Sequence, residues 1–253
     1  MDDNEIKNKV REDYGRIATE SQSGCGCGCG CGPTTVDSSV AIGYNKDDLS
    51  GIPEDAILGL GCGNPIANAD LKEGETVLDL GSGGGIDCFL AAKRVGESGQ
   101  VIGVDMTSEM INRARETKKS EGIDNVEFRL GEIENLPVSD NAVDLIISNC
   151  VINLSTDKER VFKEVFRVLK PGGRLNVSDI VLVSDLPDKI KNDPNFYVGC
   201  VSGAVKESEY LGLIEKAGFK DISTTLNFNT GAPDKKQVVI KSITVKAFKP
   251  EKN

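Results

Sequence analysis

Cysteine is the residue type that most restricts the chemistry open to this chain. The sequence has 253 residues, with eight cysteines and no histidine. Without imidazole, Ser-His-Asp and Cys-His catalysis and mixed Cys/His zinc sites are excluded, so any reaction must use carboxylates, thiols, amides or a cofactor. Cys62, Cys150 and Cys200 lie in stretches that are predicted to meet at one edge of a sheet. Three converging thiols with no base beside them suit a soft, thiophilic centre that carries a lone pair.

The other cysteines are of two kinds. Four alternate with glycine in a low-complexity repeat, at Cys25, Cys27, Cys29 and Cys31. Such a repeat forms neither a helix nor a stable strand, so it either presents accessory thiols to a metal or metalloid on a tether or is dispensable. Cys88 is flanked by apolar residues and is predicted to be buried in the core, as free cysteines often are.

A glycine-rich turn provides the second chemical signal. Residues 77–85 read VLDLGSGGG, and a helix is predicted from Ile86. A strand, a tight turn and a helix start bring backbone N–H groups up to a ligand, and glycine is needed because a Cβ would block that approach. The stretch therefore predicts a site for a nucleotide-type cofactor at the carboxyl end of a strand.

The details of this turn argue against a dinucleotide. Ile86 stands where the dinucleotide fingerprint has its third glycine, and Asp79 precedes the turn. A carboxylate at that place suits the ammonium group of an amino acid better than a pyrophosphate. Asp105 ends the next predicted strand, where an acidic residue accepts hydrogen bonds from ribose hydroxyls. Glu132 follows the third strand, placed to contact an adenine edge, and Asn149 follows the fourth.

Alternating strands and helices must position these residues. Apolar runs predict strands over residues 76–80, 100–105, 126–130, 143–148 and 174–179, and amphipathic patterns predict helices over 86–95, 108–121, 158–169 and 207–217. Pro171 and the two glycines after it are predicted to separate the third of these helices from the fifth strand. Two β-rich stretches, about 221–228 and 237–248, would close the sheet as an antiparallel pair. This order predicts an α/β fold with a doubly wound, seven-stranded, mostly parallel sheet.

The chain is predicted to have three parts. Residues 1–40 hold the Cys-Gly repeat and an amphipathic helix over 1–20 that packs on the domain or covers the site. Residues 41–180 form the cofactor-binding domain. Residues 181–253 hold an acceptor-binding insertion after the fifth strand, followed by the closing helix and strands.

The charge balance excludes some partners. Acidic residues number 40 and basic residues 30, which gives a net charge of −10. Nucleic acid and anionic membranes bind basic patches, so neither is expected as a partner. No stretch resembles a signal peptide or a membrane span, so a cytoplasmic location is expected.

Several of these features together resemble the signature of class I S-adenosylmethionine-dependent methyltransferases. They are the turn at residues 79–85, Asp105, Glu132 and the turn LKPGG at residues 169–173, and the resemblance covers roughly residues 70–245. It implies S-adenosylmethionine as the cofactor. By the family pattern the methionine part is held by Asp79, Gly81, Ser82, Gly83 and Gly85, the ribose by Asp105, and the adenine by Met106, Glu132 and Ile133, with Asn149 beside them.

The stretches around the cysteines resemble the arsenite methyltransferases in particular. They read LGLGCGNP at residues 58–65, SNCVINL at 148–154 and FYVGCVSGA at 196–204. The resemblance implies that Cys62, Cys150 and Cys200 are the catalytic residues and bind As(III), which arrives as arsenite or its thiol complexes.

A thiol reductant of the thioredoxin or glutathione type is implied as co-substrate, because methylation oxidises the arsenic and reduction must precede another cycle. One interpretation has a disulfide between Cys62 and Cys31 or a neighbour take part in that reduction. Which cysteine of the repeat matches the family's N-terminal cysteine stays open. The long C-terminal extension of some relatives is not expected here.

Two other functions fit parts of the sequence. A class I methyltransferase for a quinone or another small carbon or nitrogen nucleophile would need only the shared core and would leave Cys62, Cys150 and Cys200 as packing residues. A cysteine-rich metalloid-binding protein would use the repeat as a chelator. The intact set of cofactor-binding residues argues against this last function.

Overall fold

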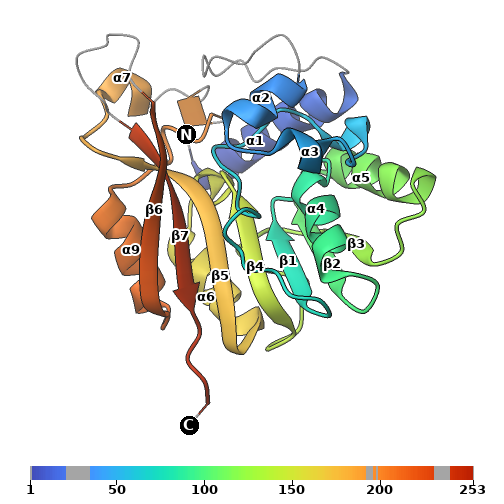
Figure 1. Ribbon diagram of the computed structural model, residues 1–253. Helices are drawn as coiled ribbons and strands as arrows, with labels where there is room; N and C mark the ends of the chain where they lie inside the picture. The colour runs from blue at the N-terminus through green and yellow to red at the C-terminus, as the bar shows by residue number, and fades with distance from the viewer. Residues whose placement is uncertain (1, 21–34, 192–195, 198, 231–239, 253) are drawn as a thin grey trace.

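One mixed sheet, with strands in the order β3-β2-β1-β4-β5-β7-β6, organises the computed structural model, which describes residues 2–20, 35–191, 196–197, 199–230 and 240–252 (Figure 1). β1 to β5 pair in parallel, whereas β7 pairs antiparallel with both β5 and β6. The predicted seven-stranded, mostly parallel sheet is therefore confirmed. The strands are β1 (Thr76–Leu80), β2 (Gln100–Asp105), β3 (Val126–Leu130), β4 (Val143–Asn149), β5 (Leu169–Leu182), β6 (Lys220–Thr230) and β7 (Ile240–Phe248).

Helices cover both faces of this sheet. In β1 the side chains alternate, so Leu78 packs in a core with α6 and α9, and Val77 packs in a second core with α4 and α5. The helices are α1 (Asp3–Thr19), α2 (Thr35–Ala41), α3 (Lys46–Leu49), α4 (Ile86–Val95), α5 (Ser108–Ser120), α6 (Lys158–Val168), α7 (Asp188–Lys191) and α9 (Glu207–Lys216), with 3₁₀ turns at Glu54–Ala56 and Ile152–Leu154. No helix of the described residues is long and apolar enough to span a membrane.

The start of β5 differs from the prediction. The strand begins at Leu169, before Pro171, and not at Arg174. Leu169 pairs with Val143, and the register then shifts, so that the proline and the two glycines form an irregularity inside the strand and do not separate it from α6. The chain after β7 supports this irregularity, because Gly172 N–H donates to Lys249 O and Lys249 N–H donates to Gly173 O. The glycines indicated a turn, but long-range backbone pairing decided the boundary.

α1 lies across the carboxyl ends of the parallel strands (Figure 1). The helix begins with a capping box, in which Asp2 and Glu5 accept hydrogen bonds from each other's backbone N–H groups. Lys7 and Arg11 form ion pairs with Glu132, just beyond β3. The N-terminal helix therefore reaches over the edge of the sheet where ligands bind in this class of fold.

β5 is tied to the segment before β1 by one buried arginine. Arg174 pairs with both carboxylate oxygens of Glu75, at 2.7 and 2.8 Å, and donates to the carbonyls of Ala69 and Asp70. Its side chain is 9% exposed and that of Glu75 is 12% exposed. The arginine lowers the pKa of Glu75, although burial alone would raise it. This cluster fixes the segment that connects the Cys62 loop to β1.

We expect Arg174→Ala to lower the free energy of unfolding by about 3–5 kcal/mol, because Glu75 would keep its hydrogen bond from Lys72 N–H but would be left as a buried charge without its cationic partner. Urea denaturation measures the loss. The matched control is Arg129→Ala, which breaks an ion pair with the half-exposed Glu127 and should cost less than about 1 kcal/mol. Equal losses in the two variants would contradict a structural role for the buried pair.

Candidate active site

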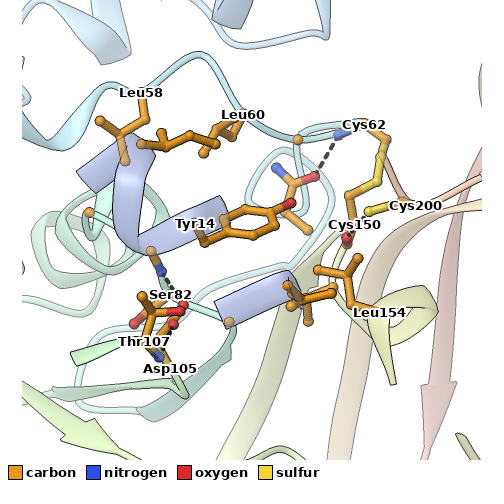
Figure 2. Close-up of a pocket in the computed structure, with 18 of the residues that line it drawn as sticks. Tyr14, Leu58, Leu60, Cys62, Ser82, Asp105, Thr107, Cys150, Leu154 and Cys200 are labelled. Carbon is orange, nitrogen blue, oxygen red and sulfur yellow. Dashed lines mark hydrogen bonds between the residues drawn. A yellow bond between two sulfur atoms is a disulfide. The ribbon is translucent and has the colours of Figure 1, made fainter. Parts of the chain in front are cut away.

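A cavity of about 740 Å³ opens at the carboxyl edge of the sheet (Figure 2). This volume lies within the range of small-molecule and cofactor sites. One wall is the glycine-rich turn after β1, the opposite wall carries three cysteines, and α1 crosses between them. The cavity-lining residues that the sequence predicted are Cys62, Asp79, Gly81, Ser82, Gly83, Asp105, Met106, Ile133, Asn149, Cys150 and Cys200.

The glycine-rich turn has the backbone that its sequence requires. Gly81, Gly83 and Gly85 all have φ between 50° and 96°, in the left-handed region that only glycine adopts freely. Gly85 is the N-cap of α4, and a Cβ on it would press against Phe128 and Phe89, so it serves packing. Gly83 lines the cavity, and a Cβ on it would meet no atom within 4 Å. The turn thus leaves room at Gly83 for a ligand.

We expect Gly83→Ala to weaken binding of S-adenosylhomocysteine by about tenfold or more, because the added methyl would occupy that room. The matched control is Gly122→Ala, since Gly122 also has a positive φ and open space around its Cα but does not line the cavity. Both variants should lose about 1–2 kcal/mol of stability from backbone strain. Calorimetric titration measures the affinity, and an equal loss in both variants would show that the turn does not contact the cofactor.

Asp79 and Asp87 form a buried acidic pair in the cavity wall. Asp79 is 2% exposed and its Oδ2 accepts a hydrogen bond from the Cys88 thiol at 3.3 Å. Burial raises the pKa of Asp79 well above its usual value, and the charge of Asp87 raises it further. Burial also raises the pKa of Asp87, to about 6. Within the described part of the chain neither carboxylate has a Lys or Arg partner, so the pair fits a ligand that brings its own positive charge.

Asp105 ends β2 beside this turn. Its Oδ2 accepts a hydrogen bond from Gly83 N–H at 3.0 Å and its Oδ1 one from Thr107 N–H at 2.8 Å. Burial raises the pKa of Asp105, and these backbone donors oppose the rise. The carboxylate therefore ties the glycine turn to the end of β2, where Met106 also lines the cavity.

Glu132 lies apart from the other predicted cofactor residues. Its side chain is 41% exposed and is directed to Lys7 and Arg11 of α1, at 2.7 and 3.3 Å, and it is not among the residues that line the cavity. Its neighbours Ile133 and Glu134 do line it. An acidic residue after β3 was readable in the sequence, but its partner on α1 was not.

The three predicted cysteines come together from distant parts of the chain (Figure 2). Cys62 and Cys150 form a disulfide with their Cα atoms 5.5 Å apart, and the Cys200 thiol donates to Cys150 O at 2.7 Å. All three are buried, in one cluster with Val10 and Leu154. The interpretation that Cys62 pairs with Cys31 or a neighbour is wrong for this structure.

The whole Cys-Gly repeat, with Cys25, Cys27, Cys29 and Cys31, lies outside the described residues. Cys88 is fully buried, as predicted, and among the described residues Cys88 and Cys200 are the cysteines that are not in a disulfide. In this oxidised state no group of three Cys, Asp or Glu side chains among the described residues is arranged to hold a metal ion. Reduction of the disulfide would place three thiols side by side.

Backbone geometry sets the direction of two of these thiols. Cys150 and Cys200 have φ of 59° and 63°, which side-chain-bearing residues seldom adopt. Such conformations persist where the surrounding contacts enforce them, and they concentrate at functional sites. Cys150 N–H donates to Ser178 O, and Cys200 N–H donates to Tyr197 O. The backbone of each of these two cysteines is thus held by its own N–H hydrogen bond.

The sequence reasoning missed Tyr14 and Asp87, which line the cavity, and Tyr44, which does not line it but contacts Asp87. Tyr14 of α1 points toward the cysteines, and its hydroxyl is hydrogen-bonded with Cys200; burial raises its pKa well above the usual value (Figure 2). Tyr44 and Asp87 are hydrogen-bonded to each other beside the glycine turn. Tyr14 lies within the amphipathic helix predicted over residues 1–20, and no element is predicted for residues 35–49, where Tyr44 lies. Of the three, Asp87 was the most predictable, because an acidic residue directly after the glycine turn lies next to the predicted cofactor site.

Comparison with known proteins identifies the family to which the chain belongs. A family model described as a methyltransferase domain matches residues 71–218. A curated arsenite methyltransferase of Halobacterium salinarum is 45% identical over all of this chain and 68% of its own length. The curated arsenite methyltransferase of Aquipseudomonas alcaligenes is 41% identical over 73% of this chain and 55% of its own length. The chain thus spans about half to two thirds of the length of these relatives.

A solved structure gives the same relationship. The arsenic(III) S-adenosylmethionine methyltransferase of Chlamydomonas reinhardtii matches with a TM-score of 0.64 and 35% identity, over 87% of this chain and 75% of that one. The sequence match to the Halobacterium salinarum protein over all of this chain agrees with it. The chain therefore belongs to the arsenite methyltransferase family and has the class I methyltransferase fold.

Proposed function

We propose that this chain transfers methyl groups from S-adenosylmethionine to trivalent arsenic held by the thiolates of Cys62, Cys150 and Cys200, and so detoxifies arsenic. One observation carries the proposal: three cysteines from separate parts of the sequence share one wall of the cavity whose other wall is the glycine turn. Thiolates are ligands for soft centres, and no packing role requires three of them together at a cavity wall. The family membership of the chain supports the same substrate.

The cofactor would lie along the acidic and glycine-rich wall. S-adenosylmethionine supplies an electrophilic methyl group on a sulfonium. Asp79 and Asp87 would hold its ammonium group, which would bring one positive charge to two buried carboxylates that have no other cation beside them among the described residues. Asp105 would accept hydrogen bonds from the ribose, and Met106 and Ile133 would pack against the adenine. Asp105 would then have to share its oxygens with the two backbone N–H groups it now accepts from.

The acceptor side must be reduced before arsenic binds. Two electrons and two protons from an external thiol reductant convert the Cys62–Cys150 disulfide into two thiols beside Cys200. Arsenite then exchanges its three oxygen ligands for three sulfurs and releases water, as each thiol gives up its proton. The arsenic lone pair is the nucleophile and carries no proton. No general base is needed, which agrees with a chain without histidine.

The main contribution of the protein to rate would be alignment. Holding an arsenic lone pair and a methyl group at bonding approach replaces a bimolecular encounter by a unimolecular step. Transfer would form an As–C bond and break the S–CH3 bond of the sulfonium, with S-adenosylhomocysteine as the leaving group. The arsenic would be oxidised by two electrons, so a thiol reductant of the thioredoxin or glutathione type must supply two electrons before the next cycle. We place this chemistry in the cytoplasm, because a thiol-dependent reaction needs a reducing compartment.

Incubation of the purified chain with arsenite, S-adenosylmethionine and a thiol tests the proposal. Chromatographic separation of arsenic species should show methylated arsenicals that form only when all three are present. Arsenite binding without any methylated product would indicate a metalloid-binding protein and not an enzyme. Methylation of a quinone but not of arsenite would make Cys62, Cys150 and Cys200 packing residues.

A further inference from the structure

Asn149, directly before Cys150, clamps the loop that carries Cys62. Its Oδ1 accepts a hydrogen bond from Cys62 N–H at 2.9 Å, and its Nδ2 donates to Gly63 O at 2.8 Å. Donor and acceptor on opposite sides of one amide fix its orientation. Gly61 allows the close approach, because a Cβ there would lie 2.7 Å from Nδ2. The position of Cys62 against Cys150 therefore depends on this amide.

Tyr44 extends the chain of hydrogen bonds to the cofactor wall. Asn149 Nδ2 donates to the Tyr44 hydroxyl at 2.9 Å, and that hydroxyl donates to Asp87 Oδ1 at 2.8 Å. Tyr44 is 3% exposed and Asp87 is 4% exposed, so water does not compete for these bonds. Three consecutive hydrogen bonds thus join the carboxylate of Asp87 to the backbone of Cys62.

The charge of Asp87 sets the direction of these bonds. An ionised carboxylate only accepts, so the Tyr44 O–H must point to it and leave its oxygen lone pairs to Asn149. A protonated Asp87 can donate to the Tyr44 oxygen and compete with Asn149. The groups around Asp87 are Asp79, Tyr44 and Asn149, and the charged one among them, Asp79, is also acidic. A cation bound between the two carboxylates favours their ionised forms.

We propose that Tyr44 and Asn149 are positioning residues that couple the two halves of the site. The ammonium group of the cofactor, bound at Asp79 and Asp87, orders the Cys62 loop through Tyr44 and Asn149, so cofactor and trivalent arsenic bind with positive cooperativity. This inference rests on the proposed function, because it takes Asp87 as the ammonium site and Cys62 as an arsenic ligand. Linkage requires the effect to be reciprocal: arsenic must strengthen cofactor binding by the same factor.

The test measures binding and not turnover. Reduced protein is titrated with phenylarsine oxide, a trivalent arsenical, with and without saturating S-adenosylhomocysteine, which carries the same ammonium group. In the wild-type chain S-adenosylhomocysteine should raise the affinity for phenylarsine oxide by about fivefold or more, which is the usual lower range of coupling between two sites. In Tyr44→Phe, which loses the hydroxyl, the ratio of the two affinities should fall to within twofold of one.

Two further variants separate coupling from loss of structure. Asp87→Asn keeps the volume and an acceptor for Tyr44 but removes the charge, so it should also bring the ratio close to one. It keeps the test valid should Tyr44→Phe fail to fold. Tyr210→Phe is the matched control, because Tyr210 is also a fully buried tyrosine that donates to a buried carboxylate, that of Asp179, outside the cavity lining. It should keep the wild-type ratio.

A wild-type ratio of one, or an undiminished ratio in Tyr44→Phe and Asp87→Asn, would overturn the coupling. A loss of the ratio in Tyr210→Phe as large as that in Tyr44→Phe would also overturn it, because the effect would then be one of general stability. These results leave the proposed function intact if arsenite is still methylated. Failure of the reduced wild-type protein to bind phenylarsine oxide at all would instead contradict the arsenic site.

Discussion

The Cys150→Ser variant is expected to methylate arsenite at least about 100-fold more slowly than the wild-type chain. A hydroxyl is a hard, protonated group, so trivalent arsenic would keep at most two sulfur ligands, those of Cys62 and Cys200. Arsenic held by fewer ligands is less well aligned with the methyl group, and a displacement of about 1 Å can cost about 100-fold in rate. The measurement is the initial rate of methylarsenical formation under a saturating thiol.

Cys88→Ser is the matched control for that experiment. Cys88 is the other buried thiol of the described chain apart from the three at the cavity wall, and serine keeps a donor for Asp79. Its rate should stay within several-fold of wild type. Full activity of Cys150→Ser would contradict the proposed three-thiolate site. An equal loss of rate in both variants would mean that the buried thiols affect the rate only by stabilising the fold.

The Asp79→Asn variant is expected to bind the cofactor at least about 30-fold more weakly, which corresponds to about 2 kcal/mol, the lower range for breaking a buried charge pair. The same change should stabilise the ligand-free protein. Burial raises the pKa of Asp79 in the folded chain above its value in the unfolded chain. Above the unfolded-state pKa, folding must therefore protonate or bury the charge of Asp79, which lowers the stability by an amount that grows as the pH rises toward the folded-state pKa.

An asparagine removes this cost, so the thermal midpoint of ligand-free Asp79→Asn at neutral pH should rise by about 2–4 °C, or about 1 kcal/mol. The difference from wild type should disappear below the unfolded-state pKa, where Asp79 is protonated in both states. Glu127→Gln should instead lower the thermal midpoint, because Arg129 lowers the pKa of Glu127 and the charge of Glu127 therefore favours folding. A lower midpoint for Asp79→Asn, with unchanged cofactor affinity, would contradict both parts of the prediction.

Local patterns were enough to predict most of the sheet. β1, β2 and β3 begin and end where the apolar runs do, and α4 matches its predicted range. Each of these elements buries an apolar run or stripe of its own, so the local sequence is enough to predict where it begins and ends. The glycine turn was equally readable, because a positive φ at three positions leaves few residue types to choose from.

Features that depend on distant pairing were not predictable in this way. β5 extends back to Leu169 because strand β4 and the chain after β7 pair with it, and neither partner is visible in the local sequence. The Cys62–Cys150 disulfide joins residues 88 positions apart, and sequence alone does not select among eight cysteines. Glu132 illustrates the same limit, since Lys7 and Arg11 reach it from α1.

The Cys62–Cys150 disulfide also means that the described chain holds two electrons fewer than a form with three free thiols at the cavity wall. On the proposed function, an oxidised molecule would not bind arsenic until a reductant had opened the disulfide, whatever the arsenite concentration. The fraction of molecules ready to act follows the ratio of reduced to oxidised thiols in the surroundings. The thiol redox state of the surroundings, and not only the arsenite concentration, would thus set the fraction of this protein that is active.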